Sequence, residues 1–85
     1  MVNQTIESLF TELCKKHDLT AISVHINLEC SETHMWHSFM HWGGGVGHAY
    51  GANAGKALSN TLADVAARRG ADITVPSDIE VGVPE

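Results

Sequence analysis

The chain has 85 residues and a mass of 9.1 kDa, with 44% hydrophobic and 18% charged residues. This length supports one small domain and excludes a two-domain enzyme. Ten acidic and five basic residues give a formal net charge of −5, which disfavours a nucleic-acid-binding protein and favours a protein partner with a basic surface.

The first part of the chain predicts one helix followed by two strands. Apolar residues recur at helical spacing over residues 3–17, with charged residues between them, as in an amphipathic helix. From residue 20 the apolar residues alternate with polar ones, which predicts a strand over 20–29. After a polar turn, the same alternation predicts a second strand over 34–42.

The two predicted strands form an antiparallel hairpin when their apolar rows share a face. In that register Ile22 lies near Met40, and Ile26 lies near Trp36. His25 is then expected near His37, on the opposite face of the hairpin.

The second part of the chain predicts a connector, a helix and a tail. Five glycines in residues 43–51 favour a flexible connector, and an amphipathic helix follows over 52–69. Gly70 is placed to end that helix in the left-handed conformation. The tail, residues 71–85, holds two short apolar runs separated by Pro76, one of which could add an edge strand.

The predicted fold class is α+β, a two-layer α-β-β-α sandwich with an antiparallel hairpin sheet and both helices on one face. Residues 1–70 form the single expected domain, and residues 71–85 form a C-terminal tail. A short third strand from this tail is the alternative to a two-stranded sheet. An open sheet of two or three strands has unpaired edges, so we also expect a homodimer.

The candidate binding surface is the polar face of the hairpin. By alternation, His25, Met35, His37, Phe39 and His41 share this face. Aromatic and methionine side chains dominate the energy of protein interfaces, and histidine tolerates partial burial there. These five residues are therefore the predicted protein-binding face, and histidine protonation predicts that its affinity changes between about pH 7 and pH 5.

All six histidines fall within residues 17–48, which raises the question of a metal site. On an extended strand His37 and His41 are about 13 Å apart, which is too far to share one ion. His34 is expected on the opposite face, and His48 in the glycine connector. We therefore predict no metal and no cofactor, and keep a His-rich metal- or small-anion-binding protein as the alternative.

A weak anion site is predicted at Gly51, Gly55 and Lys56, because helix N-termini attract anions. The P-loop pattern is not met, since Tyr50 replaces its first glycine and Ala57 replaces its hydroxyl residue.

The order of helix, strands and helix resembles that of double-stranded RNA-binding domains, whose second helix begins with a basic cluster. That cluster is reduced here to Lys56. Too few donors remain for phosphates, so direct RNA binding is not expected.

The function predicted from the sequence is a non-catalytic protein-binding accessory or inhibitor module. Small size and acidity are typical of phage or mobile-element products that, like anti-CRISPR proteins, inhibit a host nucleic-acid machine. Cys30 and His34 offer a conceivable nucleophile and base, but no oxyanion donors can be assigned, so no enzyme is expected. No secretory leader or membrane span is evident, which predicts a cytoplasmic protein with two free thiols.

Overall fold

The computed structural model describes residues 6–70, and the predicted tail strand lies outside them. Two helices enclose three consecutive strands in the order α1 (Ile6–His17), β1 (Ala21–Ile26), β2 (Trp36–Trp42), β3 (Gly45–Gly51) and α2 (Ala54–Arg69). The strands form one antiparallel sheet in the order β1-β2-β3. The α+β class predicted from the sequence is confirmed, with an α-β-β-β-α order in place of α-β-β-α.

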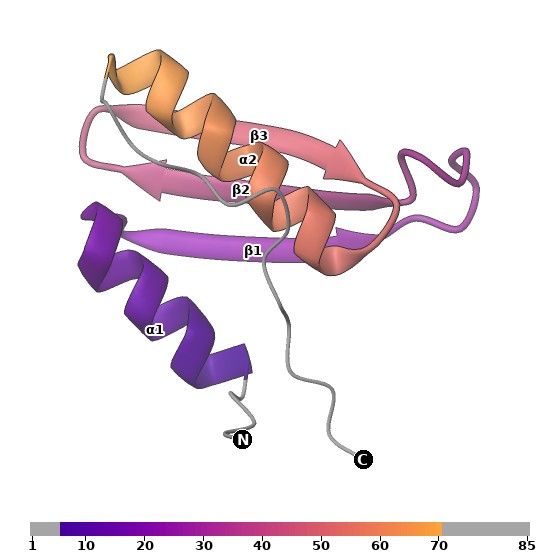
Figure 1. The fold of residues 1–85 in the computed structure, drawn as a ribbon, viewed down its shortest axis with the longest axis horizontal. Helices are drawn as coiled ribbons and strands as arrows, with labels where there is room; N and C mark the ends of the chain where they lie inside the picture. Colours follow the sequence, from indigo (N-terminus) through magenta and orange to yellow (C-terminus); the bar gives the residue numbers. More distant parts are fainter. Residues whose placement is uncertain (1–5, 71–85) are drawn as a thin grey trace.

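The helices cover the sheet unequally. Figure 1 shows α2 crossing over β2 and β3, whereas α1 lies beside β1 at the other edge of the sheet. Among residues 6–70 no helix covers the opposite face of the sheet (Figure 1). One sheet face is therefore left without a helical layer.

The register predicted for the hairpin of β1 and β2 is confirmed. Ile22 pairs with Met40, His25 with His37, and Ile26 with Trp36. Both strands are shorter than predicted, because residues 27–35 form turns between them.

The prediction of a flexible connector over residues 43–51 is wrong, because Gly45–Gly51 forms β3. On β3 every second residue is glycine or alanine, and two of these positions, Gly47 and Gly51, lie against α2. A Cβ atom on Gly47 would come within 2.8 Å of Val65 Cγ2, and one on Gly51 within 2.8 Å of the Lys56 carbonyl carbon. The two glycines let the α2 backbone lie directly against the strand, so they serve close packing and not flexibility.

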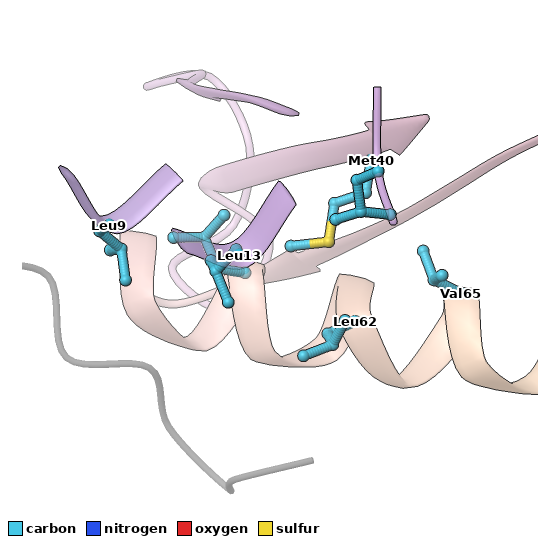
Figure 2. Close-up of a cluster of buried hydrophobic side chains, with 7 residues drawn as sticks. Leu9, Leu13, Met40, Leu62 and Val65 are labelled. Atoms are coloured by element: carbon cyan, nitrogen blue, oxygen red, sulfur yellow. The ribbon is translucent and has the colours of Figure 1, made fainter. Parts of the chain in front are cut away.

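The core lies between the helices and the covered face of the sheet (Figure 2). Met40 and Leu58 are fully buried, and the cluster also contains Leu9, Leu13, Leu19, Leu62 and Val65. These residues come from α1, β2, α2 and the segment after α1, so both helices are held by one apolar cluster. The amphipathic pattern predicted for each helix is thus confirmed at its central positions.

The ends of α2 follow the chemistry expected of helix caps. Asn53 accepts a hydrogen bond from Lys56 N at 2.8 Å through its side chain, and Gly70 has a φ of 63°, as predicted. Near the C-terminal end, Arg69 Nη1 donates to the His17 carbonyl oxygen at 2.6 Å, and its guanidinium lies over the Trp42 ring. Arg69 therefore ties α2 to the end of α1 and to β2.

Candidate functional site

The uncovered face of the sheet carries nine side chains, three from each strand. Alternation along the strands and the pairing register place on it Ala21, Ser23, His25, His37, Phe39, His41, Val46, His48 and Tyr50. We call these nine residues the histidine face. None is Asp, Glu, Lys or Arg, so at neutral pH the face carries no formal charge beyond that of its histidines.

His37 lies at the centre of a group of packed rings. Its ring stacks on Tyr50 with the centroids 4.0 Å apart, and it contacts Phe39 at 4.3 Å. On either side, His25 of β1 and His48 of β3 approach it edge-on at 5.1 and 5.2 Å. The five rings come from three adjacent strands, and the hydrogen-bonded sheet beneath them fixes their spacing.

Two histidines lie elsewhere than the sequence predicted. His48 was expected in a flexible connector, but β3 places it on the histidine face, with its Nδ1 3.1 Å from His37 Nε2. His34 was expected on the opposite face, but its ring lies 5.4 Å from that of Tyr50. His34 precedes β2 in the turn, where strand alternation no longer determines its direction.

Of the five residues predicted for the binding face, His25, His37 and Phe39 are in mutual ring contact. His41 lies further along β2, opposite Ala21 and Val46, and is exposed. Met35 is half-buried just before β2, and its carbonyl oxygen accepts from Asn27 N at 2.7 Å. His48 and Tyr50 were missed. The alternation of small and large residues in Gly45–Gly51 is the signal that could have found them.

The position of His37 affects its protonation. Partial burial lowers the pKa of His37 below its ordinary value of 6.5, and the neighbouring His25 and His48 lower it further through charge repulsion. Desolvation and like charge both favour neutral imidazole. Its position in the centre of the ring group therefore disfavours a positive charge on His37.

The outer edge of β3 is occupied by side chains of α2. Asp64 Oδ2 accepts from His48 N at 3.0 Å, and Asn60 Nδ2 donates to the Tyr50 carbonyl oxygen at 2.9 Å. Arg68 Nε also donates to Asp64 Oδ2, at 2.8 Å. Burial acts to raise the pKa of Asp64, but the hydrogen bonds from Arg68 and His48 outweigh it and the pKa is lowered. Such contacts block an edge strand from pairing with another chain.

The residues predicted for anion binding take part in packing and capping. Gly51 and Gly55 are buried, and Lys56 N is bonded to the Asn53 side chain. Ala57 N donates to the Asn53 carbonyl oxygen at 3.0 Å. Asn53 thus satisfies two of the N–H groups at the start of α2, and anion binding there stays a prediction.

Other kinds of site find little support in residues 6–70. Within them, no three or more His, Cys, Asp or Glu side chains are grouped to hold a metal ion. His34 Nδ1 lies 2.8 Å from Thr33 Oγ1 and 3.2 Å from Ser31 Oγ. Cys14 and Cys30 are free thiols, as predicted. Over the same residues, neither helix has the length and apolarity needed to cross a membrane.

The acidic excess lies mostly outside the described domain. Four of the ten acidic residues, and none of the five basic ones, fall in residues 71–85. Residues 6–70 therefore carry six acidic and five basic side chains, a formal charge of −1. Two of the six, Glu29 and Glu32, are exposed in the turns that join β1 to β2, next to the His25 end of the histidine face.

Comparison with protein-family models, curated proteins and solved structures found no match to this chain. The geometry and chemistry of the histidine face are therefore the features that point to a function.

Proposed function

We propose that this chain is a non-catalytic protein-binding module and that the histidine face is its binding surface. The observation that carries the proposal is a sheet face without a helical layer in residues 6–70, on which five rings from three strands pack together.

The composition of the face favours a protein as its ligand. Interface centres are depleted in charged residues and enriched in aromatic ones, and the histidine face has both properties. Tyr50 and Val46 are each 39% exposed, so apolar surface is available to a partner. The sheet holds the rings in place before binding, which reduces the entropy lost on association.

The size of the face indicates that the partner also contacts the adjoining turns. Three strands of six or seven residues span about 14 by 20 Å, or about 300 Å² in projection. A stable interface buries about 800 Å² on each partner. Leu28, which is 76% exposed in the turn after β1, adds apolar surface beyond the end of that strand.

Charge at the rim favours a partner with basic residues around an uncharged centre. Glu29 and Glu32 flank the His25 end of the face, and interfaces commonly combine an apolar centre with a polar rim. A module of this kind would act as an inhibitor by covering a basic functional surface of its partner. Inhibition of a nucleic-acid machine, by a phage or mobile-element product, is the specific role that we propose.

Site-specific photo-crosslinking tests the proposal. A benzophenone amino acid replaces Phe39 on the face in one version of the full chain and the exposed Ala63 of α2 in another. Both are expressed in the native host and irradiated. We expect one protein to be crosslinked from position 39 and not from position 63, and to bind the unmodified chain after purification.

Three outcomes would contradict the proposal. They are identical products from both positions, no product from position 39, and a crosslinked protein that fails to bind once purified. A crosslink from position 39 to a second copy of this chain would instead assign the face to the homodimer, which otherwise stays a prediction.

A further inference from the structure

His37 and His48 form a hydrogen bond that depends on protonation. His37 Nε2 and His48 Nδ1 are 3.1 Å apart, so one nitrogen donates its proton and the other accepts it. An accepting imidazole nitrogen carries no proton. The bond therefore exists only while at least one of the two rings is neutral.

The rings around this pair are uncharged or are themselves imidazoles, and Asp64 is the one carboxylate that interacts with the His48 charge among the described residues. From β1 the pair faces His25, and from β3 it faces Tyr50, which in turn contacts His34. From β2 itself, Phe39 lies between the rings of His25 and His48.

The charged groups of α2 near the pair, Asp64 and Arg68, already bind each other. Asp64 accepts from the His48 backbone N–H, not from its ring, and Arg68 binds the same oxygen. The groups facing His37 are thus other imidazoles, a phenol and a phenyl ring, and the nearby carboxylate already has an arginine partner.

We propose that His25, His37 and His48 form a proton-sensitive cluster whose protonation rearranges the histidine face and releases its partner. The release of a partner rests on the proposed function. The rearrangement of the face on protonation does not, because it is a property of the chain alone. Protonation of both His37 and His48 removes their hydrogen bond and places two positive charges on rings with centroids 5.2 Å apart.

The direction of the effect follows from burial. A partner that covers the face removes water from the rings, which favours their neutral form. Binding therefore expels protons, and affinity falls with acidification by about tenfold per pH unit for each proton excluded.

Imidazole NMR of the free, full-length protein tests the cluster without a partner. We expect Phe39 and Tyr50 ring resonances to shift together with the titration of His37 between about pH 7.5 and pH 5. In His48→Gln the pKa of His37 should rise, because the positive charge that His48 can carry, which disfavours a charge on His37, is removed. The aromatic shifts should be lost in a double variant, His37→Gln with His48→Gln.

His41→Gln is the matched control, since His41 is exposed on β2 further along the same face. It should leave the titration of His37 and the aromatic shifts unchanged. The proposal fails if His37 titrates without any change at Phe39 and Tyr50, or if His48→Gln leaves the pKa of His37 where it was. If the cluster behaves as proposed but the crosslinking experiment finds no partner, the proposed function fails separately.

Discussion

Gly51→Ala should destabilise the domain strongly, because α2 lies directly against the backbone of β3. The added Cβ would be 2.8 Å from the Lys56 carbonyl carbon and 2.9 Å from Ala57 Cα, whereas ordinary contacts begin at 3.4 Å. These are main-chain atoms, and Ala57 N is closer still, so α2 must move by more than about 0.5 Å, and the fully buried Leu58 moves with it. Overpacking of this kind costs about 1–3 kcal/mol, and the rigid backbone contact places Gly51→Ala near 3 kcal/mol.

Gly43→Ala provides the matched control, because a Cβ there meets nothing within 4 Å. Both substitutions reduce the entropy of the unfolded chain equally, so the comparison isolates the contact with α2. Thermal unfolding followed by circular dichroism should show a Tm lower by about 12–24 °C for Gly51→Ala. The control should stay close to wild type. Equal Tm values for the two variants would refute the packing of α2 on β3 described above.

Three further predictions concern the stability contributed by polar side chains. Ser38 Oγ is buried without a hydrogen-bond partner among the described residues, so Ser38→Ala should raise the free energy of unfolding by about 1 kcal/mol in urea; a loss of stability would reveal a missed partner. Asp64→Ala should cost about 1–3 kcal/mol and promote self-association in ultracentrifugation, because it frees the His48 N–H at the β3 edge; unchanged behaviour would show that the edge needs no protection. Burial lowers the pKa of both His17 and His37 below 6.5, so the unfolded state binds protons more readily and stability should fall as the pH drops below 6.5. Urea midpoints that stay constant from pH 7.5 to pH 5 would contradict that sign.

The sequence was most informative where polar and apolar residues alternate. The register of β1 and β2 follows from requiring Ile22 and Met40 to share the covered face, since a shift by one residue would bury the histidines. The same requirement correctly placed His25 beside His37. For this part of the site, hydrophobic patterning was sufficient.

The third strand could not be recognised by hydrophobicity, because glycine and alanine replace the apolar residues on its covered side. Gly47 and Gly51 are small because the α2 backbone approaches them, which is a tertiary requirement without a local signal. Missing β3 also removed His48 and Tyr50 from the predicted face. His34 was misplaced for a different reason, since it belongs to a turn.

Binding of the partner by the histidine face is tested most directly by calorimetric titration. The titrant is the partner that the crosslink identifies, purified separately and without the crosslink. Phe39→Asp and Val46→Asp each place a carboxylate on the face, and Ala63→Asp places one on the exposed side of α2. For variants with wild-type circular dichroism spectra, we expect Kd to rise at least about 30-fold for the two face variants and to stay within about twofold for the control. An unchanged Kd for both face variants, or an equal loss for Ala63→Asp, would contradict the assignment.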